Sequence, residues 1–420
     1  MAKVLVIGSG AREHAIAQTF LRSDQVDQVC VAPGNDGMQI NPEIKLVAIS
    51  ATQIDALIDF AQTEKIDLVF VGSEEPLTLG IVDAFQEAGI RIFGPSQAAA
   101  QLEGSKTFAN MILAENDIPT AQSKTVESLE DALEAVPAFG IPVVIKQDGL
   151  ALGKGVSILE SEADLQKLLE QIYHDNESAR IVIEEYLDGV EFSIFSFVGE
   201  NGIVHAPIAQ DHKRLLDGDL GPNTGGMGAY SPVRWISDEV RLEAIQNLVL
   251  PTIEGMKKKG IPFVGVLYTG VMLTKAGPKV IEFNVRLGDP EAQVVLPQLT
   301  SDFYEMLNEL IDGVQPRVIW QHDDVYLGVV VAAPGYPESP KHDIELHAYE
   351  KNGITINAAA LREVLGRYYS NGGRIATFVT HASTATEAQT MVYDYFAEVG
   401  MEPLQFRTDI GYQAVQSEAK

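Results

Sequence analysis

Short apolar runs separated by glycine turns and helical patterns make up the first hundred residues. Residues 4–7 are apolar at every position, as in a parallel strand covered on both faces, and a helical pattern follows to about Leu21. Further strands are predicted at residues 28–32, 68–71 and 90–93. Because strands and helices alternate, residues 1–101 are predicted to form a doubly wound α/β domain that binds ligands at the carboxyl ends of its strands.

A different order of elements begins near Ser105, where a helix is predicted to continue until just before Ile118. Beyond it come a helix, two strands joined by a glycine-rich loop, a second helix and a third strand. Their predicted bounds are residues 128–136, 143–146, 156–159, 162–173 and 181–187. This order indicates an α+β domain rather than further βα units.

Residues 280–286 alternate by twos, as in a strand with two unlike faces. One face carries Ile281, Phe283 and Val285, and the other carries Glu282, Asn284 and Arg286. The apolar face is expected to pack inward. On the polar face, a carboxylate and an amide oxygen suit a hard divalent cation, and the guanidinium beside them suits an anion. The alternative is an ordinary sheet edge with its polar residues in solvent.

Composition and charge narrow the class of protein. A chain of 420 residues suggests about three domains, and 46% hydrophobic residues are enough for each to have a core. The formal charge of -29 argues against a nucleic-acid or anionic-membrane surface. Six basic residues nevertheless lie in or beside glycine-rich or turn-rich motifs, where they could hold phosphates: Lys106, Lys146, Lys154, Lys213, Arg214 and Arg286. The alternative is chance placement among 30 basic residues.

The only cysteine, Cys30, lies in an apolar run, so a buried free thiol is expected. The N-terminal apolar run is too short for a secretory signal and leads directly into a strand–turn motif. No apolar run reaches membrane-spanning length. We therefore expect a cytoplasmic protein.

Two glycine-rich motifs differ from the common nucleotide-binding patterns. At residues 8–14 a dinucleotide fold would have glycine at position 13, where this chain has Glu13, so we reject NAD and expect a cradle for one phosphate. The loop at residues 147–155 lacks the Walker spacing and joins two strands. It is predicted to be a flap that folds over phosphates, with Lys154 near its tip and Lys146 at the strand end. A plain glycine-rich hairpin is the alternative.

Three further stretches carry candidate chemistry. The strand ending at residues 184–187 suits a hinge that binds adenine through its backbone, and Glu191 could accept ribose hydroxyls. Residues 221–230 contain four glycines and a proline, which favours close approach of backbone to ligand. The cluster at residues 210–214 precedes them, and His212 within it is predicted to be structural.

Taken in chain order, these motifs resemble the phosphoribosylamine–glycine ligase family of ATP-grasp enzymes. The motifs lie at residues 8–14, 32–35, 145–155, 210–214, 221–230 and 282–291. Single motifs occur in other ATP-grasp enzymes, but the runs at residues 223–230 and 286–291 in this order are specific. The likeness covers nearly the whole chain and weakens after about residue 340.

The resemblance implies four parts and a set of ligands. The N-terminal α/β domain would span residues 1–101, the ATP-grasp domain 102–318 with a lid at about 121–187 and a central part at about 188–318, and a small C-terminal α+β domain 319–420. ATP, glycine and 5-phosphoribosylamine would be the small-molecule substrates, with Mg²⁺ or Mn²⁺ as metal. Neither nucleic acid nor membrane would be a partner, and the chain would be a monomer or a weak homo-oligomer.

The family pattern also implies roles for individual residues. ATP would contact Lys106, Lys146, Asp148, Gly149, Gly153, Lys154, Gly155, Glu184, Glu185, Tyr186, Leu187 and Glu191. The other substrates would contact Gly10, Arg12, Glu13, Gly34, Asn35, Gly37, Asp211, Lys213, Gly225, Gly226, Met227, Arg286, Gly288 and Asp289. Catalysis would depend on Lys146, Lys154, Asp211, Lys213 and Arg286. Glu282 and Asn284 would bind the metal, and because residues 266–273 contain no carboxylate, phosphate oxygens and water would complete its shell.

Several positions depart from the family pattern. Asp36, Ser73 and Leu287 replace a small residue, a proline and a phenylalanine. The C-terminal His-Ala-Gly-Thr run is missing, and the nearest stretch is at residues 354–360. The runs at residues 371–374 and 408–411 persist.

The implied chemistry solves a specific problem, because an amine cannot attack a carboxylate that keeps its charge. Phosphorylation would convert glycine into glycyl phosphate, from which phosphoribosylamine displaces phosphate. Such a reaction depends on positioning and charge neutralisation, which fits the absence of a Ser-His-Asp or Cys-His motif. One alternative is another ATP-grasp ligase of purine biosynthesis, such as a formate-using enzyme. The other is a non-catalytic nucleotide-binding protein.

Overall fold

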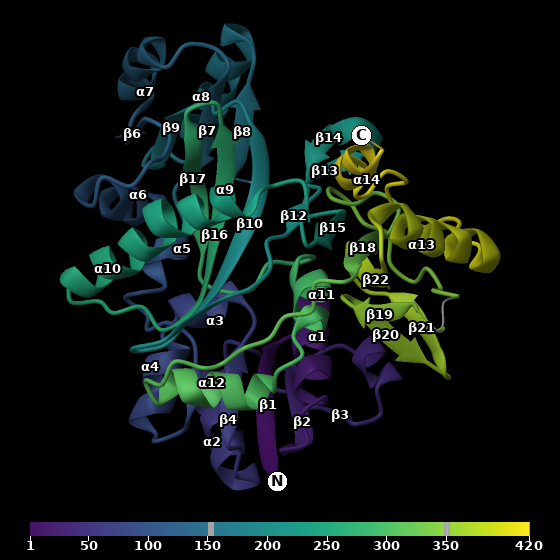
Figure 1. Ribbon diagram of the computed structural model, residues 1–420. Coiled ribbons are helices and arrows are strands. Elements are labelled where there is room, and N and C mark those ends of the chain that lie inside the picture. Colours follow the sequence, from purple (N-terminus) through teal and green to yellow (C-terminus); the bar gives the residue numbers. More distant parts are fainter. Residues whose placement is uncertain (150–154, 348–350, 352, 420) are drawn as a thin grey trace.

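The computed structural model describes residues 1–149, 155–347, 351 and 353–419. Its N-terminal part is a five-stranded parallel sheet in the order β3-β2-β1-β4-β5, at the lower end of Figure 1. The elements are β1 (Ala2–Gly8), α1 (Ala11–Phe20), β2 (Val26–Pro33), β3 (Ile44–Leu46), α2 (Ile54–Glu64), β4 (Leu68–Val71), α3 (Glu74–Thr78), α4 (Ile81–Glu87) and β5 (Ile92–Phe93). In β1, Leu5 and Ile7 join one hydrophobic cluster and Val4 and Val6 another, so both faces are covered. The predicted doubly wound sheet is confirmed.

Two short helices, α5 (Gln101–Gly104) and α6 (Lys106–Glu115), lead to a four-stranded antiparallel sheet with its own hydrophobic cluster. This unit, called the lid here, has the strand order β6-β9-β7-β8. Its elements are β6 (Ser123–Val126), α7 (Leu129–Ala135), β7 (Val143–Gln147), β8 (Val156–Leu159), α8 (Glu162–Asp175) and β9 (Ile181–Glu185). The pairing of β7 with β8 confirms the predicted hairpin.

The central sheet is antiparallel, in the order β11-β10-β16-β17. Its strands are β10 (Val190–Val198), β11 (Ile203–His205), β16 (Gly265–Thr274) and β17 (Gly277–Asn284). The associated helices are α9 (Asp238–Ala244), α10 (Leu250–Lys258), α11 (Ala292–Val295) and α12 (Phe303–Ile311). The described ranges contain no helix long and apolar enough to span a bilayer.

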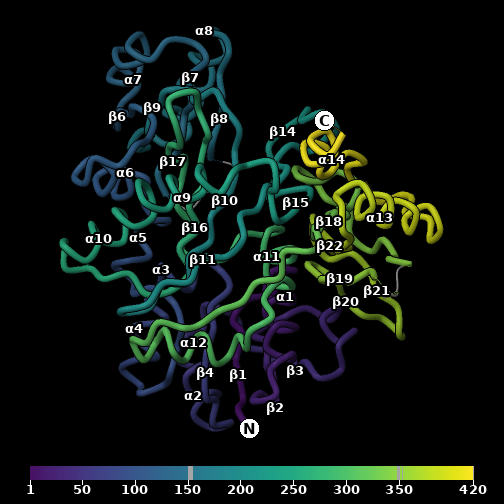
Figure 2. Tube along the Cα trace, in the orientation of Figure 1, coloured from purple at the N-terminus to yellow at the C-terminus, as the bar shows by residue number. Residues whose placement is uncertain are grey.

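A third large sheet combines two distant parts of the chain, in the order β12-β15-β18-β22-β19. β12 (Gln210–Asp211) and β15 (Gly228–Ser231) come from the middle of the sequence; β12 pairs with β15, and β15 pairs with β18 (Val325–Ala332). Figure 2 shows this teal segment beside the yellow-green C-terminal strands. The other elements are β13 (Arg214–Leu216), β14 (Leu220–Asn223), β19 (Thr355–Ala358), β20 (Leu361–Val364), β21 (Arg367–Ser370), β22 (Arg374–Ala382), α13 (Ala385–Val399) and α14 (Tyr412–Glu418). The glycine-rich run at residues 221–230 therefore leads into a strand of the C-terminal sheet.

The stretch that replaces the His-Ala-Gly-Thr run lies against the N-terminal domain. Asn357 Nδ2 donates to Gln18 Oε1 at 2.7 Å, and the Ala358 N–H donates to His14 Nδ1 at 2.9 Å. The Asn35 amide donates to the carbonyl oxygens of Ala358 and Ala359 at 3.1 and 3.2 Å. Asn35 therefore connects two domains through its side chain.

His14 in this interface should make stability depend on pH. Burial lowers the pKa of His14 from 6.5 to about 4, although its hydrogen bond with Asn41 opposes the shift. Between these values the unfolded chain binds the extra proton, so acidification favours unfolding. We expect His14 to remove up to about 3 kcal/mol of stability as pH falls from 6.5 to 4.

Urea unfolding of the parent and of His14→Gln, measured from pH 7 to pH 4, checks this expectation. The variant should begin less stable, because it loses the acceptor for the Ala358 N–H. Its stability should then fall less steeply with acidification than that of the parent. Parallel curves would mean that His14 titrates alike in both states.

Candidate active site

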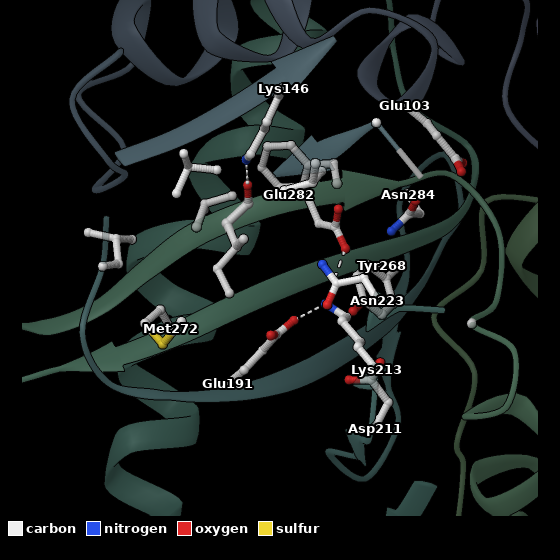
Figure 3. A pocket seen from close by; sticks show the side chains of 18 of the residues that line it. Glu103, Lys146, Glu191, Asp211, Lys213, Asn223, Tyr268, Met272, Glu282 and Asn284 are labelled. Carbon is white, nitrogen blue, oxygen red and sulfur yellow. Dashed lines mark hydrogen bonds and ion pairs between the residues drawn. The ribbon is translucent and has the colours of Figure 1, made fainter. Parts of the chain in front are cut away.

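A cavity of about 730 Å³ lies where the lid, the central sheet and the C-terminal sheet meet. Figure 3 shows Glu282, Lys213, Glu191 and Tyr268 converging on it from different elements, with Lys146 above them. The wall formed by β16 and β17 is antiparallel, with Tyr268 opposite Asn284. The cavity therefore brings together residues that the sequence places far apart.

Most residues predicted from the motifs line this cavity. They are Arg12, Lys106, Lys146, Gly149, Gly155, Glu184, Glu185, Tyr186, Leu187, Glu191, Asp211, Lys213, Gly225, Glu282, Asn284, Arg286, Gly288 and Asp289. A second group does not contribute to the lining: Gly10, Glu13, Gly34, Asn35, Gly37, Asp148, Gly226 and Met227. The predictions for Gly153 and Lys154 lie outside the described residues.

Glu282 and Asn284 of β17 reach the cavity as predicted, but the alternation holds only in part. Ile281, expected to pack inward, lies at a register shift and is half-buried, and both it and Phe283 line the cavity as well. Phe283 is buried, whereas Glu282 and Asn284 are half-buried. Gly270 lies opposite Glu282, and a side chain there would place its Cβ 3.2 Å from the Glu282 Cγ. The missing side chain on β16 thus leaves room for the carboxylate.

Lysine and arginine side chains keep the Glu282 carboxylate ionised. Burial alone would raise the pKa of Glu282, but Lys213, Lys146 and Arg286 lower it below its usual value. Lys213 Nζ lies 3.5 Å from Glu282 Oε1. Arg286 Nη2 donates to Asn284 Oδ1 at 3.1 Å. In this state both predicted metal ligands interact with cationic side chains of the protein.

Lys213 is the centre of an acidic cluster at the base of the cavity. Its ammonium forms an ion pair with Glu191, seen in Figure 3 as a dashed contact. Burial would lower the pKa of Lys213, but Glu191 and Asp211 raise it well above its usual value. The pKa of Asp211 is raised mainly by burial, against the effect of Lys213. Lys213 is therefore firmly cationic in its half-buried position.

Two lysines hold the lid against the rest of the site. Lys146 Nζ lies 2.6 Å from Glu184 Oε2 and donates to the Ile281 carbonyl at 2.9 Å, which connects β7 to β17. Lys106 Nζ donates to the Gly149 carbonyl at 2.8 Å. Asp148 accepts from the Lys106 N–H at 2.7 Å at the start of α6. In this structure Asp148 therefore holds the base of the glycine-rich loop to a helix N-terminus.

The first glycine motif encloses a carboxylate of the protein itself. Glu13 accepts from the Gly10 N–H at 2.6 Å and from Arg12 Nε at 2.6 Å. A Cβ at Gly8 or Gly72 would lie 2.5 or 2.3 Å from the Glu13 side chain, so both glycines are needed to accommodate it. The sequence predicted that this helix N-terminus binds a phosphate. In this structure its Gly10 N–H donates to the Glu13 carboxylate instead.

Arg286 is also paired within the protein. Its Nη2 lies 2.8 Å from Glu103 Oε1, and its Nε lies 3.3 Å from Glu74 Oε2. Burial would raise the pKa of Glu74, but Arg286 and Arg12 lower it to about 2. Arg286 is therefore paired with two carboxylates that line the same cavity and that the sequence did not indicate.

His212, predicted to be structural, is almost fully buried below the cavity. Its Nε2 accepts from the Gly411 N–H at 2.9 Å, which ties the C-terminal segment to β12 and its neighbours. Burial lowers the pKa of His212, so the ring is neutral and suited to this acceptor role. The prediction for His212 agrees with these contacts.

Other residues of the cavity were missed in the sequence. They are Glu74, Glu103, Asn223, Tyr268, Glu291, Arg374 and Tyr412. Three of them, Asn223, Glu291 and Arg374, lie in the runs at residues 221–230, 286–291 and 371–374. These runs could therefore have identified the three residues as candidates for the site. Glu74, Glu103 and Tyr268 carry no local pattern that separates them from ordinary surface or core residues.

Comparison with known proteins identifies the family. Three domain families match: the phosphoribosylglycinamide synthetase N domain at residues 2–103, its ATP-grasp (A) domain at 104–292 and its C domain at 326–413. The phosphoribosylamine–glycine ligase of Streptococcus pneumoniae R6 is 47% identical over 421 residues, which cover 99% of this chain and 100% of that protein. The Lactococcus lactis protein of the same name is 46% identical and covers 98% and 100%.

Solved structures agree with the sequence relatives. The crystal structure of the phosphoribosylamine–glycine ligase of Thermotoga maritima has a TM-score of 0.85 at 31% identity, covering 98% of this chain and 100% of that one. A biotin carboxylase from Campylobacter jejuni has a TM-score of 0.73 at 15% identity over 96% and 92%, which shows a shared fold only. The resemblance inferred from the motifs is confirmed. The chain therefore belongs to the phosphoribosylamine–glycine ligase family and is an ATP-dependent ligase that joins glycine to 5-phosphoribosylamine in purine biosynthesis.

Proposed function

We propose that ATP and the two acceptor substrates occupy the one cavity together and that glycine is activated there as glycyl phosphate. The observation that supports this most directly is the continuity of the cavity. Lid and central-sheet residues line one end, and Asp211, Gly225, Asp289 and Arg374 line the other. A phosphoryl group can therefore pass from nucleotide to amino acid without leaving the site.

The reaction has two displacement steps. A carboxylate oxygen of glycine attacks the γ-phosphorus of ATP, the bond to the β-phosphate oxygen breaks, and ADP leaves. The amine nitrogen of phosphoribosylamine then attacks the carbonyl carbon of glycyl phosphate. The bond from that carbon to the phosphate oxygen breaks, the nitrogen loses a proton, and an amide and inorganic phosphate remain. Positioning and charge neutralisation carry both steps, with no covalent bond to the protein.

Glu282 and Asn284 are proposed to hold Mg²⁺ or Mn²⁺. The donor set fits a hard cation, because an ionised carboxylate and an amide oxygen lie two residues apart on a half-buried face of β17. The described residues contain no cluster of three or more His, Cys, Asp or Glu able to hold a metal, so ATP oxygens are expected to supply further ligands. A bound divalent cation would neutralise phosphate charge during transfer.

The nucleotide is proposed to lie between the lid and the central sheet. Lys106 and Lys146 line the cavity beside the lid strands, and burial lowers the pKa of Lys106. Leu187 provides a buried apolar surface for adenine, and Glu191 is available for ribose hydroxyls once Lys213 turns to substrate. The residue roles predicted for Glu184, Glu185 and Tyr186 are retained in this proposal.

Glycine and phosphoribosylamine are proposed to bind at the opposite end. Asp211, Asp289 and Glu291 line that end, so the ammonium group of glycine finds carboxylates there. Lys213 and Arg286 are the cations for its carboxylate and for the transferred phosphoryl group. The predicted substrate residues of the N-terminal domain that do not line the cavity would act indirectly, through the shape of their loops. They are Gly10, Glu13, Gly34, Asn35 and Gly37.

Trapping of the activated glycine tests the proposed intermediate. With ATP, Mg²⁺ and glycine but no phosphoribosylamine, added hydroxylamine should give glycine hydroxamate and ADP in equal amounts, because hydroxylamine attacks the acyl phosphate. Formate in place of glycine should give no ADP above background. Hydroxamate formation without ADP, or ADP release supported by formate alone, would contradict the proposal.

The division into domains at residues 1–101, 102–318 and 319–420, with the lid at about 121–187, is proposed as the set of moving parts. The separate hydrophobic cluster of the lid supports its independence. The protein is also proposed to be a monomer or weak homo-oligomer in the cytoplasm.

A further inference from the structure

Arg374 lies between two loops at the end of the cavity that is proposed to bind glycine and phosphoribosylamine. This end is called the acceptor end here. It is the first residue of β22 in the C-terminal sheet. Its Nη1 donates to the Gly225 carbonyl at 2.6 Å and to the Asp289 carbonyl at 2.7 Å. Its Nη2 donates to Asp289 Oδ2 at 2.9 Å. One guanidinium therefore joins the glycine-rich loop at residues 221–228 to the acidic turn at residues 286–291.

The C-terminal domain also holds the other side of Gly225. The Gly225 N–H donates to Tyr336 Oη at 3.0 Å. Tyr336 packs against the residue before Arg374, since a Cβ on Gly373 would lie 2.3 Å from the Tyr336 ring. Both polar backbone groups of Gly225 are thus held by adjacent side chains of one domain.

The two loops fit together closely at this point. Gly226 has a φ of +107°, and a Cβ there would lie 2.5 Å from Pro290 Cδ. A Cβ on Gly225 would lie 3.1 Å from Arg374 Cζ. The glycines therefore let the loop approach both the turn and the guanidinium, which agrees with the use of glycine for close backbone contact.

Asp289 is held so that its carboxylate keeps one direction. Arg374 contacts Oδ2, and Gln293 Nε2 donates to Oδ1 at 2.7 Å. Gly10 lies on the open side, where a Cβ would be 3.5 Å from Asp289 Oδ2. An arginine suits this task because its planar group can reach a backbone carbonyl on each loop and a carboxylate at once, which an ammonium cannot do in the same geometry.

We propose that Arg374 is a positioning residue for the ligase reaction: it fixes the glycine-rich loop against the acidic turn and so sets the geometry of the acceptor end of the site. The proposal rests on the proposed function, which places glycine and phosphoribosylamine at that end. Its contacts are with the two acceptor loops. The nucleotide end, formed by the lid and central sheet, should keep its geometry without it.

Steady-state kinetics of Arg374→Gln tests the inference. The values of kcat/KM for glycine and for phosphoribosylamine should fall about a hundredfold, because small displacements of reacting groups have effects of this size. KM for ATP and the affinity for ADP, measured by calorimetry, should stay within about twofold of the parent. A matching rise in the KM for ATP and a matching loss of ADP affinity would indicate general disorder and overturn the proposal, as would unchanged kinetics.

Three further variants keep the test decisive if Arg374→Gln folds poorly. Arg374→Lys keeps the charge but not the bridging fork, so it should still lose at least about tenfold toward the acceptors. Tyr336→Phe removes only the acceptor for the Gly225 N–H and should show a smaller loss of the same selectivity. Arg362→Gln, in a more exposed ion pair with Asp343 of the same domain, is the matched control and should behave as the parent. If Arg374→Lys and Tyr336→Phe both kept the kinetic constants of the parent, the proposal that Arg374 positions the two loops would be overturned.

Asp289→Asn separates failure of this inference from failure of the site proposal. If Asp289→Asn lowers kcat/KM for the acceptors but the Arg374 variants do not, the positioning role of Arg374 is wrong, whereas the placement of glycine and phosphoribosylamine beside this turn is supported. If Asp289→Asn and the Arg374 variants both leave acceptor kinetics unchanged, the placement of glycine and phosphoribosylamine beside this turn is wrong as well. Matching acceptor losses in both support the proposal.

Discussion

A Glu282→Gln substitution is expected to lower glycine-dependent ADP formation by at least about a thousandfold, which corresponds to the loss of several kcal/mol of charge stabilisation. Glutamine keeps the size of the side chain and leaves the fit against Gly270 intact. It removes the negative charge that Lys213, Lys146 and Arg286 keep ionised, and with it the strongest proposed ligand for the cation. ADP release in the presence of ATP, glycine, phosphoribosylamine and Mg²⁺ is the measurement.

Glu243→Gln is the matched control for this change. Glu243 is an exposed carboxylate on α9 of the same domain, so its loss should leave turnover within about twofold of the parent. Chelation of divalent cations should stop the parent enzyme, and added Mn²⁺ or Mg²⁺ should restore it while failing to restore Glu282→Gln. If Glu282→Gln turned over near the parent rate, Glu282 would not be a ligand of the metal.

The second large effect is expected for Lys146→Met. Lys146 is buried and paired with Glu184, and it reaches the Ile281 carbonyl across the site. Its loss should lower kcat/KM for ATP by about a hundredfold or more, as expected when one partner of a buried charge pair is truncated. It should also cost about 3 kcal/mol of stability, because Glu184 is left as an unpaired buried charge. Initial rates at varied ATP and urea unfolding measure the two effects.

The double variant Lys146→Met/Glu184→Gln separates catalysis from stability. Removing the carboxylate along with its partner should recover most of the lost stability, since no isolated charge remains buried. Activity with ATP should stay low, because the cation for the phosphates is still absent. Recovery of both properties together would show that Lys146 acts only through the structural pair.

Arg286 shows how far a local pattern reaches. The repeat of two predicted that it would share a face with Glu282 and Asn284, and it lines the cavity with them although β17 ends at Asn284. The same repeat predicted that Glu282 and Asn284 line one wall, and they do. The ion pairs of Arg286 with Glu74 and Glu103 could not be predicted, because those residues lie 212 and 183 positions away and carry no pattern that points toward it.

Glu13 illustrates a motif whose position was predicted but whose contacts were not. The glycines at residues 8 and 10 indicated a tight turn before a helix, and the turn is present. Absence of a third glycine excluded the dinucleotide pattern. That the Glu13 carboxylate would take the Gly10 N–H depends on the space between β1 and β4, which exists only once the sheet is assembled.

What the sequence determined by itself was the order and type of the elements and the parallel N-terminal sheet. These follow from periods of two and 3.6 residues and from glycine turns, which act over short stretches of chain. The identity of most residues that face the cavity followed from the resemblance of the motifs to a known family. Only the tertiary structure decided that residues 210–231 join the C-terminal sheet and that Arg374 clamps loops 149 and 85 residues away. Such contacts arise from the packing of whole domains, and no local repeat along the chain encodes which distant charges will meet.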